Sequence, residues 1–187
     1  LQDILDFSRN LRMEKKLKEI NLYYFIEDIL NSGDFGENQE EVDIRLMVSQ
    51  DFEVISDPIR LKIIIKNIVS NAIKFSNRMQ NICWLRISAL RVDSKFQLII
   101  EDNGEGIRPD LENKIFDMFY RGSEKSKGAG LGLYIVKEMI DKLDGVINVN
   151  SVYGEGSQFI IEIPDHKFSH HIPESISNEV LAPKTDL

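Results

Sequence analysis

Apolar residues recur every three to four positions in several segments of the chain, which indicates amphipathic helices. Helices are expected over residues 22–31, 58–75, 109–120 and 131–143. Asn21 and Asp57 directly precede the first two segments, and their side-chain oxygens can cap the free amides of a helix start. Pro109 opens the third segment and Gly145 follows the fourth, and both are typical boundary residues. Residues 1–14 carry another apolar stripe, and we expect them to be the end of a longer helix.

Apolar and polar residues alternate in other segments, which is the pattern of half-buried strands. Strands are expected over residues 42–48, 52–55, 82–92, 95–101, 146–152 and 157–163. The first two are expected to pair, and turns at residues 93–94 and 154–156 should join the others into two hairpins. Hairpins and helices without parallel crossovers predict an α+β fold, a two-layer sandwich. The chain after Pro164 has little apolar periodicity and is expected to be a flexible tail.

The composition fits one soluble domain, because 42% of the 187 residues are hydrophobic and 29% are charged. The formal net charge of -8 argues against a nucleic-acid partner, since such partners require clustered Lys and Arg. Cys83 is the single cysteine, so an internal disulfide is excluded, and its apolar neighbours predict a buried thiol in a reducing compartment. The longest apolar runs are far shorter than the roughly 20 residues that cross a bilayer. We therefore expect this piece to be soluble. Because the chain starts without methionine, we also expect it to come from a longer protein, which could be membrane-bound.

Two asparagines on the second expected helix are the first candidate for chemistry. Asn67 and Asn71 are four residues apart, so both amides project from one helix face. Neutral oxygens suit a magnesium ion that keeps most of its waters, and Lys74 adds a positive charge suited to phosphate. Taken alone, a pair of solvated asparagines explains the same spacing.

A glycine-containing segment, D-N-G-E-G, ends the fourth expected strand at residues 102–106. The Asp102 carboxylate could accept a hydrogen bond from the exocyclic amine of adenine, and the glycines would let the backbone approach the base. An ordinary turn explains Asp-Asn-Gly equally well.

A second glycine-rich segment, G-A-G-L-G-L, opens the last expected helix at residues 128–133. It lacks the preceding parallel strand of a dinucleotide-binding fingerprint and the Gly-Lys-Ser/Thr of a Walker loop. Backbone amides at a helix start can still bind an anion, while a flexible hinge is the alternative. G-E-G-S at residues 154–157 is, by itself, a hairpin turn.

Five motifs closely resemble, in the same order, the successive boxes of sensor histidine kinase catalytic domains. Those domains belong to the GHKL superfamily, which also includes DNA gyrase, the mismatch-repair ATPases and the ninety-kilodalton heat-shock chaperone. The motifs are N-I-V-S-N-A-I-K-F (67–75), D-N-G-E-G (102–106), F-D-M-F-Y-R (116–121), G-A-G-L-G-L (128–133) and G-E-G-S-Q-F (154–159). The resemblance covers about residues 15–164 and implies the Bergerat ATP-binding fold. In that fold a mixed, mostly antiparallel sheet of about five strands packs on three helices. I-L-D-F-S-R at residues 4–9 resembles the end of a dimerisation helix, so residues 1–14 would belong to that helix and residues 165–187 to the tail.

The resemblance also implies roles for individual residues. Asn71 would hold magnesium, Lys74 and Arg121 would meet the triphosphate, Phe75 would line the nucleotide pocket and Asp102 would recognise adenine. The implied catalytic set is Asn67, Asn71, Lys74 and Arg121. Further pocket and lid residues would be Gly104, Gly106, Ile107, Phe119, Gly128, Gly130, Leu131, Gly132 and Leu133. Arg121 could instead form a local ion pair with Glu124.

The function implied is transfer of the γ-phosphate of Mg-ATP to a histidine on a dimerisation domain. That domain is expected to be absent from this chain, because the histidines of the chain all lie at or beyond His166. A metal-binding tail is a weaker reading of those histidines. A hydrolytic ATPase of the superfamily would carry a glutamate base where this chain has Asn67. A non-catalytic regulatory module is the other alternative, because the acceptor histidine is missing and Ala129 replaces the usual Thr or Ser. The implied partners are ATP, the kinase's own histidine-bearing dimerisation domain and a response-regulator receiver domain, in a homodimeric, cytoplasmic assembly without nucleic acid.

Overall fold

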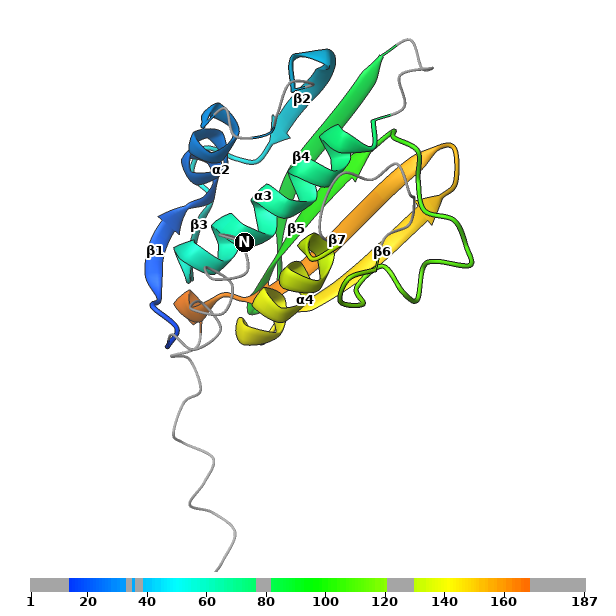
Figure 1. Cartoon of the computed structure of the whole chain (residues 1–187). Coiled ribbons are helices and arrows are strands. Elements are labelled where there is room, and N and C mark those ends of the chain that lie inside the picture. Colours follow the sequence, from blue (N-terminus) through cyan, green and yellow to red (C-terminus); the bar gives the residue numbers. More distant parts are fainter. Residues whose placement is uncertain (1–13, 33–34, 36–38, 77–81, 121–129, 169–187) are drawn as a thin grey trace, which may run out of the picture.

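The computed structural model of the chain describes residues 14–32, 35, 39–76, 82–120 and 130–168 (Figure 1). Residues 1–13 of the helix expected over residues 1–14 lie outside the described residues, as do residues 121–129, which include Arg121 and Gly128, and the chain beyond residue 168.

A five-stranded sheet forms one layer of the fold, in the order β2-β4-β5-β7-β6. The strands are β2 (Val42–Met47), β4 (Cys83–Val92), β5 (Lys95–Asp102), β6 (Val146–Val152) and β7 (Gly156–Pro164). The expected hairpins β4–β5 and β6–β7 are confirmed, and β5 also pairs with β7 antiparallel. Three of the four strand pairs are therefore formed by antiparallel neighbours.

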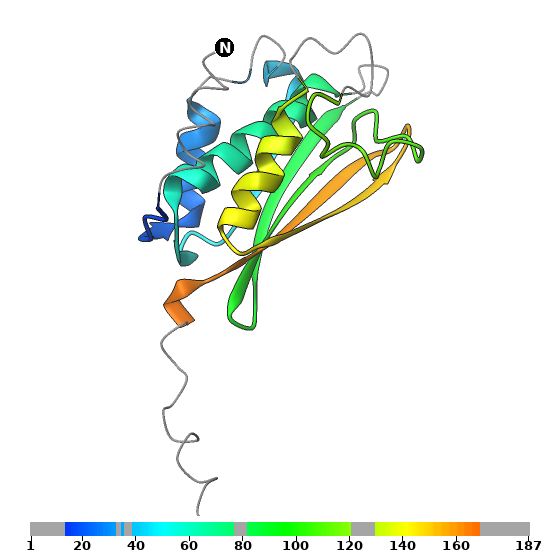
Figure 2. The same cartoon turned by 60° about the horizontal axis from the view of Figure 1, so that its bottom comes forward.

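Three α-helices within the described residues form the other layer: α2 (Leu22–Asn31), α3 (Pro58–Lys74) and α4 (Gly132–Lys142). Figures 1 and 2 show α3 and α4 side by side across one face of the sheet. Alternate strand residues such as Leu98, Ile100 and Ile161 are fully buried beneath them, together with Ile68 of α3 and Val136 of α4. The α+β two-layer fold expected from the sequence is confirmed.

Two helix starts expected from the sequence, those capped by Asn21 and Asp57, are also confirmed. The Asn21 side chain accepts a 3.2 Å hydrogen bond from the Tyr24 amide at the start of α2. The Asp57 side chain accepts bonds from the Ile59 and Arg60 amides, at 3.0 and 3.1 Å, at the start of α3. Such caps satisfy amides that have no partner within the helix.

The expected pairing of residues 42–48 with 52–55 is wrong. β2 pairs with β4 in parallel, so the sheet contains one parallel crossover, which runs through α3. Residues 53–56 form β3 (Glu53–Ser56), which pairs antiparallel with the unpredicted strand β1 (Lys18–Asn21) in a separate two-stranded sheet. Alternation reports that a strand has one buried face, but it does not report which strand lies beside it.

The helix expected over residues 109–120 is also wrong, because this segment forms successive turns. Its backbone bonds join residues three apart, such as Lys114 N to Leu111 O at 2.8 Å and Asp117 N to Lys114 O at 2.9 Å. No residue of this segment is buried. A helix of about 12 residues is marginal in water unless its apolar face is packed, and here no other element that the structure describes covers that face.

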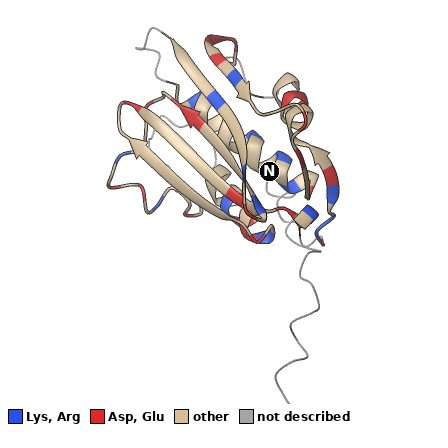
Figure 3. Cartoon of the chain, turned by 180° about the vertical axis from the view of Figure 1, so that it is seen from behind, with Lys and Arg blue, Asp and Glu red and all other residues tan. Residues whose placement is uncertain are grey.

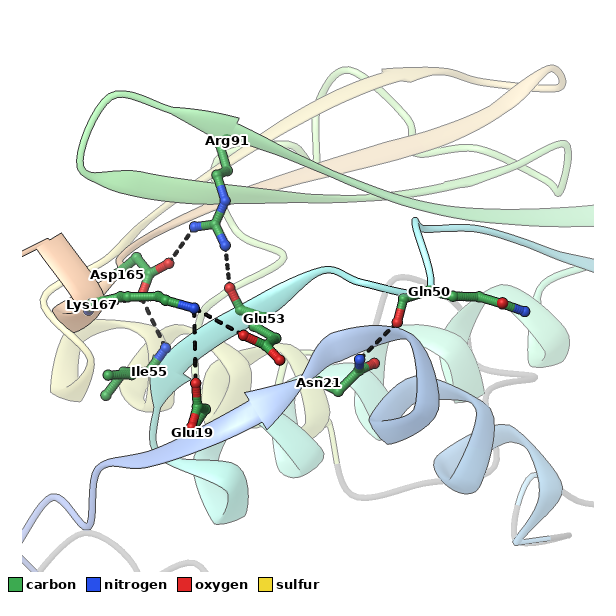
Figure 4. A network of polar contacts seen from close by, with 8 residues as sticks. All are labelled: Glu19, Asn21, Gln50, Glu53, Ile55, Arg91, Asp165 and Lys167. Carbon is green, nitrogen blue, oxygen red and sulfur yellow. Dashed lines mark hydrogen bonds and ion pairs between the residues drawn. The ribbon is translucent and has the colours of Figure 1, made fainter.

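A network of polar contacts joins the two-stranded sheet to the end of β7 (Figure 4). The buried Asp165 side chain accepts bonds from the Ile55 amide at 2.9 Å and the Lys167 amide at 3.0 Å, and pairs with Arg91 at 2.5 Å. Lys167 also contacts Glu53 of β3 at 2.9 Å. The folded region therefore continues to Phe168, beyond the Pro164 boundary expected for the tail.

Acidic and basic positions are interspersed along the strands and helices (Figure 3). In the part of the chain that the structure describes, no helix combines the length and apolar character required to span a bilayer.

Candidate functional site

Asp102 lies at the end of β5, close to the C-terminal end of α3. Strand alternation places Asp102 on the same face as Ile100 and Leu98, which is the face that the helices cover. The C-terminal end of α3 reaches the following loop, where the Glu105 amide donates a 2.9 Å bond to the Phe75 carbonyl. The start of α4 lies against the middle of α3, where Gly132 faces Asn67.

The two asparagines of α3 face the start of α4. A Cβ atom at Gly132 would lie 3.1 Å from Asn67 Oδ1 and 4.0 Å from Asn71 Nδ2. The Asn67 amide group also donates a 2.8 Å bond to the Ile63 carbonyl one turn earlier. This bond fixes the Asn67 oxygen toward Gly132, so both amides converge on the gap between the helices.

The Asp102 carboxylate is held by backbone amides in a half-buried position. Its Oδ1 accepts a 2.8 Å hydrogen bond from the Gly104 amide. Burial raises the pKa of Asp102 to about 6, although hydrogen bonds from the Gly104 and Ser157 amides oppose the shift. The group is therefore ionised at neutral pH and has lone pairs left to accept a bond from a ligand.

The first glycine box has no room for side chains. A Cβ at Gly104 would lie 2.6 Å from the Phe75 carbonyl oxygen. Gly106 has a φ of +67°, and a Cβ there would overlap the Val152 carbonyl. These glycines are therefore required by backbone packing around Asp102.

The β6–β7 turn supports this loop from the other side. Gly154 N donates a 2.7 Å bond to the Glu105 carbonyl, and the Ile107 amide donates a 2.8 Å bond to Ser151 Oγ. Ser151 in turn donates to the Gly156 carbonyl at 2.8 Å. Ser151 is not predictable from the sequence, because its partner Ile107 is 44 residues away and no local pattern marks the contact.

The second glycine segment is described from Gly130 onward. Gly130 has a φ of +69°, and its Cβ would lie 2.6 Å from the Tyr120 carbonyl oxygen. Residues 120 and 130 are thus in contact. Arg121 and Gly128, together with Ala129, lie outside the described residues, so their roles stay predictions.

The other expected pocket residues differ in their surroundings. Lys74 Nζ lies 4.9 Å from the centre of the Phe75 ring, which places both at the site end of α3. Phe119 is 61% exposed. Leu131 is buried in the hydrophobic core, and Ile107 and Leu133 pack against that core. The structure therefore gives Leu131 a packing role, and a nucleotide contact by its side chain stays a prediction.

The arrangement fits an adenine nucleotide with a hydrated magnesium ion. Asp102 presents an acceptor, the first glycine box packs closely on Phe75 and Val152 beside it, and α4 begins beside the two asparagines. Within the described residues, no group of three or more His, Cys, Asp or Glu side chains could hold a metal ion. An ion held by one amide oxygen and by phosphate groups suits magnesium, which seldom requires a complete protein cage.

Comparison with known proteins agrees with this geometry. A family model described as "Histidine kinase-, DNA gyrase B-, and HSP90-like ATPase" matches residues 56–167. The sensor-like histidine kinase SenX3 of Mycobacterium bovis is 27% identical over 178 residues, which cover 92% of this chain. The chain spans 43% of the length of that relative.

Two solved structures share the fold. The catalytic domain of the histidine kinase ThkA is 27% identical with a TM-score of 0.68, and the match covers 80% of this chain and 96% of that one. Full-length ShkA in complex with AMPPNP is 26% identical with a TM-score of 0.74, and the match covers 88% of this chain and 35% of that one.

Proposed function

The chain belongs to the histidine kinase-, DNA gyrase B- and HSP90-like ATPase family, and we propose on that premise that it is the ATP-binding catalytic domain of a two-component sensor histidine kinase. It positions the γ-phosphate of ATP for transfer to a histidine on a dimerisation domain. Phosphoryl transfer requires mainly positioning and charge neutralisation from the protein, which a rigid nucleotide site can supply.

The observation that carries the proposal is the Asp102 carboxylate at the end of β5, held by the Gly104 amide at 2.8 Å. An ionised acceptor on the helix-covered face matches the 6-amino group of adenine. Guanine presents a carbonyl oxygen at the equivalent position, which would face the carboxylate without a proton between them. ATP is therefore expected to bind more tightly than GTP.

The other end of the site handles the phosphates. Asn71 would supply an oxygen to magnesium, and Lys74 and Arg121 would meet the triphosphate. When bound, magnesium neutralises the charge that develops on the phosphate oxygens. The amides of the second glycine segment and the start of α4 orient the same phosphates.

Hydrolysis is the less favoured activity. The Asn67 amide group donates to the Ile63 carbonyl at 2.8 Å, and an amide cannot take a proton from an attacking water. The nucleotide would therefore be held for transfer and would be hydrolysed slowly.

The acceptor and the regulatory partners lie in other domains. We infer that the histidine is carried by the dimerisation domain of the same, homodimeric, cytoplasmic kinase, and that a response-regulator receiver domain then accepts the phosphoryl group. The chain spans less than half of the SenX3 relative, which leaves room for such domains in the whole protein.

Transfer in trans tests the proposal. The chain is mixed with γ-labelled Mg-ATP, alone and with the dimerisation domain of its own kinase, and acid-labile label is measured on each protein. Label is expected only on the dimerisation domain, and labelling of the chain itself contradicts the proposal. Nucleotide binding without any transfer would favour the regulatory module, and rapid phosphate release would favour the hydrolytic ATPase.

A further inference from the structure

We propose that Asn103 is a positioning residue for adenine recognition: its side chain fastens the end of β5 to the start of β4 and so holds Asp102 where it meets the 6-amino group. The proposal rests on the proposed function, because it assigns a role within the same site. The neighbouring glycines and Asp102 were singled out by the sequence, whereas Asn103 was not.

The Asn103 side chain continues the sheet beyond its last strand pair. The β4–β5 register ends at Leu85 opposite Asp102. Beyond this pair, Asn103 follows Asp102 and Trp84 precedes Leu85. There the Trp84 amide donates a 2.7 Å bond to Asn103 Oδ1, and Asn103 Nδ2 donates a 2.8 Å bond to the Ile82 carbonyl. A side-chain amide carries one donor group and one acceptor like a peptide unit, so it serves here as the next partner of the strand.

The Asn103 backbone adds a weaker contact, because its amide lies 3.4 Å from the Trp84 carbonyl oxygen. At this point β5 leaves the sheet and enters the loop that carries Gly104. Without the side-chain bonds, the turn would begin at Asp102 itself. Asp102 would then keep its pairing with Ser157 of β7 but would be held less firmly on the β4 side, so its side chain could tilt away from the face that α3 and α4 cover.

Asp102 is also fixed from its other side by Gly104, whose amide donates to the carboxylate at 2.8 Å. Asn103 lies between these two residues in the chain. The Asn103 bonds to β4 therefore set the direction of the Asp102 side chain together with the pairing on β7, and the amides of Gly104 and Ser157 set its rotation. Small misplacements of a binding group can cost large factors in recognition, and an acceptor bond is sensitive to direction.

The test compares ATP with purine riboside 5′-triphosphate, which differs from ATP only in lacking the 6-amino group. Dissociation constants are measured with magnesium for the wild-type chain and for Asn103→Ala. Loss of a hydrogen bond to a charged group predicts that the wild type prefers ATP about 10- to 100-fold. In Asn103→Ala, ATP affinity is expected to fall about five- to tenfold, while the affinity for the analogue changes less than about twofold.

Asn21→Ala is the matched control. Asn21 also bridges two backbone groups, accepting from the Tyr24 amide at 3.2 Å and donating to the Gln50 carbonyl at 2.7 Å, but it lies at the start of α2. Its loss should lower the stability similarly and leave the ATP preference unchanged. In an Asp102→Asn background, Asn103→Ala should no longer change the preference, because the group on which it acts is gone.

The outcomes separate the two proposals. A wild-type chain that binds both nucleotides equally overturns the adenine assignment and this inference together. A wild type that prefers ATP, with the full preference retained in Asn103→Ala, overturns only the inference. If Asn103→Ala does not fold, Asn103→Asp carries the same comparison, since it keeps an oxygen for the Trp84 amide, loses the donor to Ile82 and adds a charge beside Asp102. Retention of the full preference in that variant overturns the inference as well.

Discussion

The backbone amide of Gly104 donates a 2.8 Å hydrogen bond to the carboxylate of Asp102, two residues earlier in the chain. The bond closes a tight loop in which the glycine has no space for a side chain, because a Cβ there would lie 2.8 Å from Asp102 Oδ1. The carboxylate is thus fixed while it remains half-buried, and its raised pKa has consequences for both binding and stability.

ATP affinity should fall as the pH is lowered through about 6, the pKa of Asp102 in the free protein. The adenine amine donates a hydrogen bond and requires the ionised carboxylate, which is lost below that pH. Dissociation constants for Mg-ATP between pH 5 and 8 measure the effect. Asp102→Asn controls for titration of the nucleotide phosphates, and an identical pH profile in this variant would contradict the assignment.

The same substitution should stabilise the protein without nucleotide. The folded pKa of Asp102 is about 6 against an ordinary 3.8, so folding favours its protonated form, and the stability gained from it is present below pH 3.8 and lost as the pH rises through 6. The full shift corresponds to roughly 3 kcal/mol, and partial solvent exposure reduces the expected gain in Asp102→Asn to about 1–2 kcal/mol at pH 7.5. Urea unfolding should show a smaller gain at pH 5, and an equal gain at both pH values would contradict the burial argument.

Asn71→Ala should remove the magnesium-dependent part of ATP affinity while it leaves the fold intact, because it deletes the expected oxygen ligand. Asn71→Asp should retain magnesium affinity. Nucleotide binding is measured with magnesium and with a chelator. Equal magnesium dependence in the wild type and in Asn71→Ala would show that Asn71 does not hold the ion.

Gly106→Ala should destabilise the protein by about 2–4 kcal/mol, because it combines a left-handed backbone with overlap on Val152. Gly154→Ala is the matched control, since Gly154 has a φ of +90° but nothing within 4 Å of its Cβ position. Its cost should be only that of the backbone, about 1–2 kcal/mol. Equal unfolding midpoints for the two variants would refute the crowding at Gly106.

Asp165→Ala should cost about 2–4 kcal/mol, because it leaves the Ile55 amide without its partner and removes the ion pair of the partly buried Arg91, which keeps only its bond to the Glu53 carbonyl. Lys167→Ala should cost less than about 1 kcal/mol, since its ion pair with Glu53 is exposed. Urea unfolding measures both. A chain ending after Pro164 should lose as much stability as Asp165→Ala, whereas one ending after Phe168 should keep these bonds.

Much of the fold follows from local signals in the sequence. Asn21 and Asp57 cap their helices within three residues, so these starts were predictable. β2 pairs with β4, which lies about 40 residues later in the chain, and the residue pattern of β2 does not indicate which strand pairs with it. The turns over 109–120 show the same limit, because a helical pattern becomes a helix only where another surface covers it.

The site residues that lie within sequence motifs were predictable, and the long-range contacts that support them were not. Asn67 and Asn71 share a helix face by spacing alone, and Asp102 ends a strand whose alternation is visible. The supporting contacts of Asn103 and Ser151 are side-chain bonds to distant backbone, for which no periodicity exists.

β7 connects the Asp102 end of the sheet to the two-stranded sheet. It begins at Gly156, which packs on the Asp102 carbonyl, and it ends at Pro164, next to the Asp165 contacts with β3. Its nine residues span about 26 Å as an extended, doubly paired rod. β1 pairs with β3, and β3 contacts Asp165 at the C-terminal end of β7. A displacement of β1 would therefore reach β7, whose other end contacts Asp102 of the proposed adenine site.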